Sequence, residues 1–248
     1  MRAYKTLATA YDMLMADVDY DAWAAYLQKL IKKNMPGAKK IADVGCGTGS
    51  ITTRLYALGY ETVGVDFSGE MLMIAAEKAR QAGERIIFME QDIRALNLPG
   101  QDVIVAACDV ANYLSVAELE LFFTQARSIL KEEGLLLFDI SSKSKLLSMD
   151  GALFYEDYDA LTYFWQNEVN AEKSKIKMEL SFFFSQDAEK ALYYREDEIQ
   201  TQHIHDVEDV LQLLLRQGYQ AKAYAFGTMD APKAGAERIQ FIAKKVSE

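Results

Sequence analysis

Short apolar runs alternate with helix-like patterns over the first 140 residues of the chain. Residues 41–44 and 134–140 are apolar runs of the length typical of buried strands. Residues 71–82 have helical spacing, and Ser115 with Glu118 forms a capping-box pattern that opens another helix. Because strands and helices alternate, the pattern predicts an α/β fold with a doubly wound, mostly parallel sheet.

A different pattern begins after residue 143. Three aromatic-rich runs alternate apolar and polar positions as antiparallel strands do, at residues 161–169, 176–184 and 192–202. Turn-forming residues separate them at 170–172 and 186–188. The sequence therefore predicts an antiparallel β insertion at residues 150–203. We call it the lid, because an insertion after the fifth strand would cover the carboxyl ends of the parallel strands, where open α/β sheets bind ligands.

Composition limits the classes of function that fit this pattern. The chain has 248 residues, of which 50% are hydrophobic, so we expect a single domain over residues 1–248. A net charge of −10 would repel a phosphate backbone, which argues against a nucleic-acid partner and favours a small-molecule substrate. Cys46 and Cys108 are the two cysteines, too few for a disulfide framework or a zinc site, and we expect no metal.

Cellular location follows from the same kind of argument. No apolar run is long enough to cross a membrane, and the first five residues contain no apolar signal region. Free cysteines fit a reducing compartment. We therefore expect a cytoplasmic protein that does not associate with membranes.

A glycine-rich turn is the strongest chemical signal in the chain. Gly45, Gly47 and Gly49 follow the first predicted strand and precede a helix, so the backbone can pass close to a ligand. Asp66 ends the next strand, where a carboxylate can accept two hydrogen bonds from a ribose diol. The spacing differs by one residue from the G-x-G-x-x-G dinucleotide fingerprint. A nucleotide-like cofactor other than a dinucleotide is favoured.

Several motifs in order resemble those of one enzyme family. The run from Asp43 to Gly49 resembles the first motif of the class I S-adenosylmethionine (SAM)-dependent methyltransferases, and the run from Val65 to Leu72 resembles the second. Further matches follow the third and fourth strands, at 91–93 and 108–109. The resemblance covers residues 40–140 and implies a seven-stranded Rossmann-like sheet, with its last two strands at 219–226 and 238–243 forming an antiparallel edge.

The resemblance also implies SAM as the cofactor and a set of residues that bind it. Gly45 and Gly47 would face the methionine part, Asp66 the ribose and Asp92 the adenine. The adenine would lie between apolar side chains, and the methionine end would be closed by residues of the N-terminal segment and of the loop after the fourth strand. The complete implied set is Tyr11, Asp43, Gly45, Cys46, Gly47, Asp66, Phe67, Met71, Asp92, Ile93, Cys108 and Asp109.

Methyl transfer from a sulfonium needs mainly an oriented nucleophile and exclusion of water. A hydroxyl or protonated amine acceptor would also need a group that takes its proton. His203 is the first candidate for this role, and Tyr113 is the second. Both also fit a structural role, His203 as a hydrogen-bonded or solvent-exposed histidine and Tyr113 as a packing residue at the mouth of the site.

Other functions remain open at this point. An NAD-linked oxidoreductase would also use Asp66 for a ribose, although the glycine spacing and Asp92 argue against it. A non-catalytic cofactor-binding protein would share every cofactor motif. The segment 109–113 lacks the Pro-Pro-aromatic signature of amino-methylating base enzymes. The sequence does not identify the acceptor molecule, its reacting atom or the oligomeric state.

Overall fold

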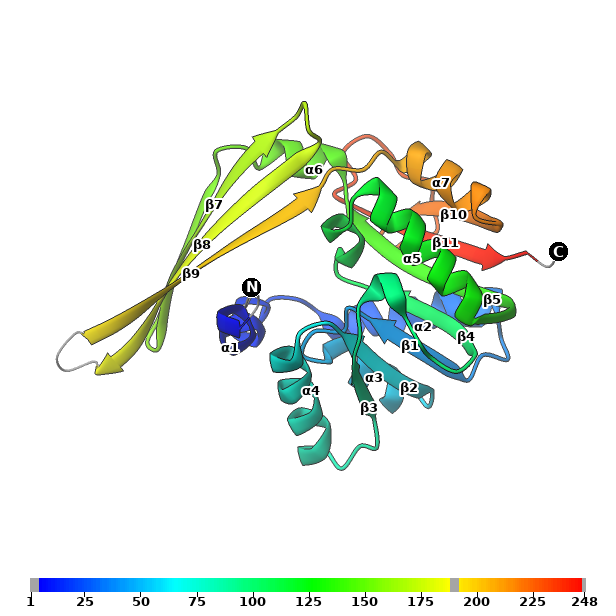
Figure 1. The fold of residues 1–248 in the computed structure, drawn as a ribbon, viewed down its shortest axis with the longest axis horizontal. Coiled ribbons are helices and arrows are strands. Elements are labelled where there is room, and N and C mark those ends of the chain that lie inside the picture. The colour runs from blue at the N-terminus through cyan, green and yellow to red at the C-terminus, as the bar shows by residue number, and fades with distance from the viewer. Residues whose placement is uncertain (1–4, 188–191, 247–248) are drawn as a thin grey trace.

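The computed structural model describes residues 5–187 and 192–246, which form a main sheet and a second, smaller sheet (Figure 1). The seven strands of the main sheet have the order β10-β11-β5-β4-β1-β2-β3. They are β1 (Lys40–Val44), β2 (Glu61–Asp66), β3 (Ile87–Glu90), β4 (Gln101–Ala106), β5 (Leu130–Ser141), β10 (Tyr219–Ala225) and β11 (Arg238–Lys245). Neighbours from β3 to β5 pair in parallel, whereas β11 is antiparallel to both β5 and β10. The doubly wound prediction and its antiparallel edge are confirmed.

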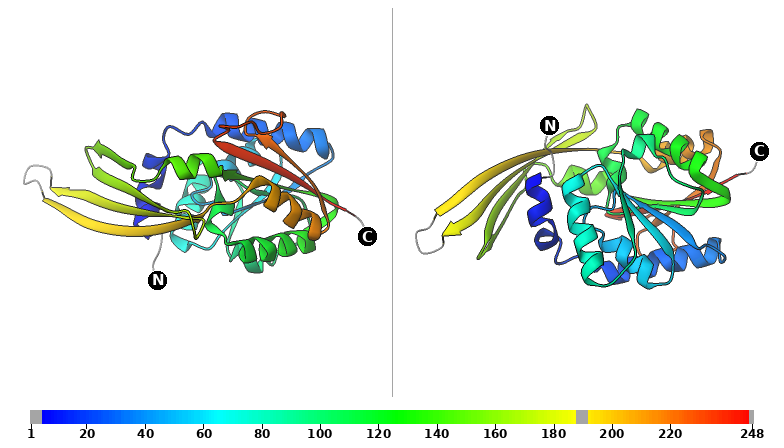
Figure 2. Two further views of the ribbon diagram at one scale, coloured as in Figure 1. Left: turned by 90° about the horizontal axis from the view of Figure 1, so that it is seen from above. Right: turned by 60° about the horizontal axis from the view of Figure 1, so that its bottom comes forward.

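Helices cover both faces of the main sheet, as their apolar faces require. The helices in the described residues are α1 (Lys5–Leu14), α2 (Tyr20–Asn34), α3 (Ser50–Ala57), α4 (Gly69–Gln81), α5 (Val116–Ile129), α6 (Lys143–Ser148) and α7 (Val207–Arg216), with the 3₁₀ turns η1 (Ile93–Ala95) and η2 (Val110–Tyr113); α1 lies against α4 and the second sheet rather than on the main sheet. The left view in Figure 2 shows α2 on one side of the sheet and α5 with α7 on the other. Within the described ranges, no helix combines the length and apolar character that a membrane crossing requires.

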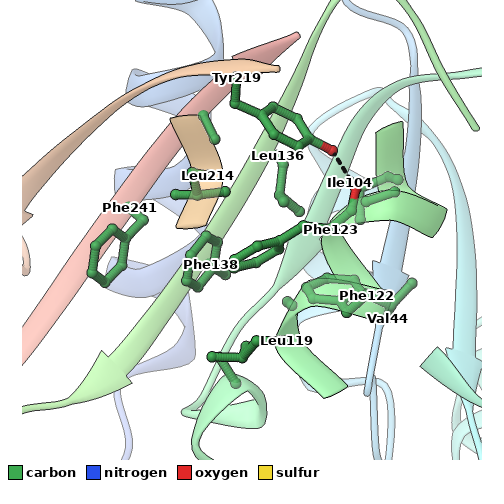
Figure 3. Close-up of a cluster of buried hydrophobic side chains, with 14 of the residues drawn as sticks. Val44, Ile104, Leu119, Phe122, Phe123, Leu136, Phe138, Leu214, Tyr219 and Phe241 are labelled. Atoms are coloured by element: carbon green, nitrogen blue, oxygen red, sulfur yellow. Dashed lines mark hydrogen bonds between the residues drawn. The ribbon is translucent and has the colours of Figure 1, made fainter. Parts of the chain in front are cut away.

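Each face of the sheet has its own buried core. The core beneath α5 and α7 contains an aromatic stack, in which the rings of Phe138 and Phe241 lie 4.8 Å apart (Figure 3). Tyr219 is buried in the same cluster, and its hydroxyl donates to the backbone carbonyl of Phe123 at 2.9 Å. This hydrogen bond offsets the free-energy cost of burying the hydroxyl. These two cores hold the strand ends, and the loops that follow them, in fixed positions.

Two helix starts differ in how they are capped. Ser115 and Glu118 form the predicted capping box at the start of α5. Asp206 precedes α7, but its side chain makes no capping hydrogen bond. Instead the Asp206 carboxylate pairs with the Lys143 ammonium at 2.9 Å. The acidic residue therefore links α7 to α6 rather than capping its own helix.

The lid is an antiparallel sheet with the order β6-β7-β8-β9. Its strands are β6 (Leu153–Tyr158), β7 (Leu161–Asn170), β8 (Lys175–Asp187) and β9 (Leu192–His203). Three strands were predicted; β6 was missed because all six of its residues are exposed and leave no alternating pattern. The predicted turn at 186–188 is wrong in part, since residues 186 and 187 belong to β8; residue 188 lies outside the described residues.

Only the inner part of the lid faces the body of the protein. We call this part the lid root; it comprises Tyr163 and Trp165 of β7, Met178 and Leu180 of β8, and residues 199–202 of β9. The outer end of the lid extends well beyond the main sheet in Figure 1. Along β8 the faces alternate as predicted, with Ile176, Met178 and Leu180 buried and Lys175 and Glu179 exposed. Helix α1 contacts both α4 and β9, and it lies between the lid and α4 in the right view of Figure 2. The lid root, α1 and the strand ends therefore enclose a common space.

Candidate functional site

The carboxyl ends of β1 to β4 bring the sequence motifs to one edge of the sheet. The glycine loop follows β1, Asp66 ends β2, Asp92 follows β3, and Cys108 with Asp109 follows β4. The strand order reverses between β1 and β4, which is where open α/β sheets bind ligands. A cavity of about 570 Å³ lies over this edge, and a small cavity of about 20 Å³ adjoins it. Every residue of the implied cofactor set lines one of these two cavities.

Glycines are required in the loop after β1 for two different reasons. Gly45 has φ +71°, and a Cβ there would lie 2.6 Å from the Cγ2 atom of Val110. Gly47 has φ +53°, and the nearest atom to its Cβ position is Cε1 of Tyr11 at 4.0 Å. The first glycine therefore permits close packing against η2. The second leaves the backbone open towards the large cavity.

Asp66 joins the glycine loop to the start of α4. One carboxylate oxygen accepts the N–H of Gly47 at 2.8 Å, and the other accepts the N–H of Ser68 at 2.9 Å. Burial raises the pKa of this carboxyl, and the backbone N–H groups of Ser68 and Gly47 oppose that shift. Each oxygen retains a further lone pair. Asp66 lines the large cavity, so both oxygens can also accept hydrogen bonds from a ribose diol.

Asp92 sits at the mouth of the large cavity in an ion-pair network that the sequence did not reveal. Arg94 donates to the Asp92 carboxylate through Nε at 2.8 Å and also pairs with Glu118. Hydrogen bonds from Arg94 hold the pKa of Asp92 below its usual range. Nearby, Phe67 is 54% exposed although it lines the cavity. An exposed ring beside a fixed carboxylate suits an adenine, which offers a flat face and an amino group.

The small cavity lies beside the glycine loop, and Gly45 lines both cavities. Asp43 is fully buried there and accepts a hydrogen bond from the Thr52 hydroxyl at 2.6 Å. Burial raises the pKa of Asp43 to about 7. Cys46 and Cys108 line the same cavity, and burial raises the pKa of both thiols. Neither thiol is therefore an activated nucleophile.

Asp139 organises the loop after β4, and sequence reasoning missed it. Its carboxylate accepts the N–H groups of Cys108 and Asp109, each at 2.9 Å. Both residues have positive φ, 63° and 52°, so the two amides converge on one side of the chain. Arg238 pairs with Asp139 and lies 3.5 Å from Asp109. The signal available in the sequence was a charged residue inside the apolar run 134–140.

The lid root supplies the wall facing the cofactor motifs. Apolar side chains from β7 and β8 line the cavity there, namely Tyr163, Trp165, Met178 and Leu180. On β9, Gln200 and Gln202 are buried polar residues. The Tyr113 hydroxyl donates to Oε1 of Gln200 at 2.8 Å, and Nε2 of Gln202 donates to Asp109 at 3.0 Å. These two bonds tie the lid to the loop after β4.

The structure brings one of the two predicted catalytic residues to the cavity. Tyr113 lines it, between the cofactor motifs and the lid. His203 is not among the lining residues. Its backbone carbonyl accepts a hydrogen bond from Asn112 at 2.9 Å, and burial together with Lys175 lowers the pKa of its ring. The cavity is lined by residues 199–202 of β9, from both faces of the strand, and His203 at the end of β9 lies just beyond them.

Helix α1 closes the remaining side of the site. Tyr11 lines both cavities, and burial raises the pKa of its hydroxyl well above the ordinary value. Asp12 holds the helix in place, since it accepts a hydrogen bond from the Thr48 hydroxyl at 2.6 Å and pairs with Lys78 at 2.9 Å. A helix that is anchored to both the glycine loop and α4 can exclude water from the space beneath it.

Comparisons with known proteins agree with this geometry. Residues 41–134 match the model of a methyltransferase domain family. A Geobacillus sp. (strain WCH70) protein named as a methyltransferase is 36% identical over 98% of this chain and 99% of its own length. A Bacillus subtilis (strain 168) protein named in the same way is 34% identical over 98% and 97%.

A solved structure supports the same conclusion. The crystal structure of a SAM-dependent methyltransferase from Clostridium acetobutylicum ATCC 824 superimposes with a TM-score of 0.87, at 29% identity, over 98% of this chain and 99% of that one. The agreement therefore includes the lid as well as the main sheet. The chain belongs to the class I SAM-dependent methyltransferases.

Proposed function

We propose that this methyltransferase transfers the methyl group of SAM to a small molecule held beneath the root of the lid. The observation that carries the proposal is a single cavity of about 570 Å³, lined at one end by the cofactor motifs and at the other by lid residues. Its volume is within the range of small-molecule sites. A macromolecular acceptor would instead need an extended open surface.

The residues present fit SAM. Asp66 has lone pairs for the ribose hydroxyls, and Phe67 with Asp92 provides a ring and a fixed carboxylate for the adenine. Open space beside Gly47 and the buried carboxyl of Asp43 suit the methionine part. Bound SAM would supply a methyl group on a positively charged sulfur, which needs no activation by a metal.

The protein contributes to the reaction by orienting the acceptor and by excluding water from the site. Tyr113 and Gln202 face the space between the cofactor motifs and the apolar lid wall. Because the Tyr113 hydroxyl donates to Gln200, its oxygen can accept a hydrogen bond from an O–H or N–H group of the acceptor. This bond would orient the acceptor so that its nucleophilic lone pair faces the methyl group, while the Tyr113 hydroxyl keeps its own proton. Helix α1 and the lid root exclude water.

Transfer of labelled methyl groups tests the proposal. The protein is incubated with methyl-labelled SAM and a cell extract that has been separated by dialysis into small molecules and retained macromolecules. We expect label in the dialysable fraction only, and none with Asp66→Ala. Label in the retained fraction would contradict the small-molecule assignment. SAM binding without any transfer would favour a non-catalytic cofactor-binding protein.

A further inference from the structure

Three basic side chains line the large cavity, and two of them are neutralised by carboxylates. Arg94 pairs with Asp92 and Glu118. Arg238 is held by Asp139 and Asp109. The third is Lys145, whose ammonium has no carboxylate or hydrogen-bond partner among residues 5–187 and 192–246. The cavity therefore contains one cation whose charge the described part of the protein leaves unbalanced.

Lys145 lies at the lid end of the cavity rather than at the cofactor end. It is half-buried on α6 and shares a helix face with Met149, four residues later, which also lines the cavity. Leu146, next to it, packs in the apolar cluster with Tyr163, Met178 and Leu180 of the lid. The ammonium is thus attached beside a largely apolar wall.

The neighbouring lysine on the same helix behaves as a surface residue does. Lys143 is exposed, does not line the cavity and pairs with Asp206. Lys145 has no such partner among the described residues, so only a molecule in the cavity can supply a counter-ion to its ammonium. An anion on the bound substrate would form a charge-assisted hydrogen bond there. The same charge would repel a cationic substrate at this position.

We propose that the methyl acceptor is an amphipathic anion: an apolar body against the lid wall, with a carboxylate or phosphate group bound by Lys145. This inference rests on the proposed function, which places the acceptor beneath the lid root. The acidic residues of the cavity outnumber its two arginines, but they lie in the cofactor motifs and at the start of α5 rather than on α6 beside Lys145. Asp92, Asp109 and Glu118 are each within ion-pair distance of an arginine, and Asp66 accepts two backbone N–H groups. The reacting hydroxyl or amine would lie at the other end of the molecule, towards Tyr113.

The proposal can be tested without the natural acceptor, by comparing the affinity of anionic probes with that of a neutral probe of similar shape. We would titrate 3-phenylpropionate, phenyl phosphate and the neutral 3-phenylpropionamide into the full-length protein by calorimetry, with and without S-adenosylhomocysteine (SAH). For the wild type we expect at least one anion to bind about tenfold more tightly than the amide, as one charge-assisted contact predicts. Preference for either anion supports the proposal, and their ratio distinguishes carboxylate from phosphate.

Variants assign the preference to one residue. Lys145→Met should abolish the preference for the anion while leaving SAH affinity within about twofold of the wild type. Lys143→Met, on the same helix but outside the cavity, should leave both unchanged. Equal binding of acid and amide by the wild type, no binding of either anion, or a preference that survives in Lys145→Met would overturn the proposal. Failure of SAH to bind the wild type would instead contradict the proposed function.

Discussion

Replacing Asp66 by alanine should weaken both the fold and cofactor binding, and the structure allows the two effects to be separated. Asp66 accepts the N–H groups of Gly47 and Ser68 even without a ligand. Removing a charged acceptor from buried donors costs about 1.5 to 3 kcal/mol for each bond. The loop lines a cavity that water can enter, so we expect the lower end of this range, about 3 kcal/mol of unfolding free energy for the two bonds together.

Loss of the bonds to the ribose should add a separate effect on binding. Water can replace part of the lost interaction with the two ribose hydroxyls, so Asp66→Ala should weaken SAH binding by about 1.5 to 3 kcal/mol in total, roughly 10- to 150-fold in Kd. Calorimetric titration measures the affinity, and urea unfolding monitored by circular dichroism measures the stability. Both are carried out at a temperature at which the variant is folded.

Asp102 provides a matched control at the other end of the sheet. Its carboxylate also accepts two backbone N–H groups, those of Lys39 at 2.9 Å and Lys40 at 2.8 Å, but it does not line the cavity. Asp102→Ala should therefore lower stability by a similar amount and leave SAH affinity unchanged. If Asp66→Ala weakens SAH binding no more than Asp102→Ala does, Asp66 is not a cofactor ligand and the reasoning fails.

Four further substitutions test three separate parts of the site. Because burial raises the pKa of Asp43 to about 7, the folded chain keeps a proton between about pH 4 and 7 that the unfolded chain has lost. The free energy of unfolding should therefore fall as pH rises through this window, by on the order of 4 kcal/mol. Urea titrations at several pH values measure this dependence, and the Asp43→Asn variant should lack it. Tyr113→Phe removes the hydroxyl that is hydrogen-bonded to Gln200, and it should lower turnover by about 10- to 100-fold with SAH affinity nearly unchanged. His203→Asn should leave turnover near the wild-type value, because His203 does not line the cavity. The reverse ranking in a methyl-transfer assay would restore His203 as the proton acceptor. Arg94→Met should let the pKa of Asp92 rise towards its ordinary value, so that SAH binding weakens at a higher pH than in the wild type, and superimposable calorimetric pH profiles would exclude a role for the Asp92 charge.

Local patterns in the sequence predicted the sheet and the cofactor motifs well, because these depend on residues close together in the chain. The glycine loop, Asp66 and Asp92 each follow a strand of the parallel sheet, so their positions follow once the strands are recognised. The capping box at Ser115 is likewise a contact between residues three positions apart. Such signals require no knowledge of tertiary structure.

Long-range partners were the part that the sequence could not predict. Asp139 and Arg238 are 99 residues apart, and only the pairing of β5 with β11 makes them neighbours. Strand β6 was missed because neither face is buried, and the role of His203 depends on how far along β9 the cavity extends. Lys145 carried no signal, since its isolation from carboxylates is visible only when the surrounding elements are in place.

In the proposed reaction, cofactor and acceptor share one cavity, and the methyl group is directed at the lid root. A crystal structure of the complex with SAH would locate the sulfur relative to the lid. We expect the ribose on Asp66, the adenine beside Phe67 and Asp92, and the sulfur facing the space between Tyr113 and Gln202. A complex with the sulfur directed away from the lid, or with SAH bound outside this cavity, would contradict the proposal.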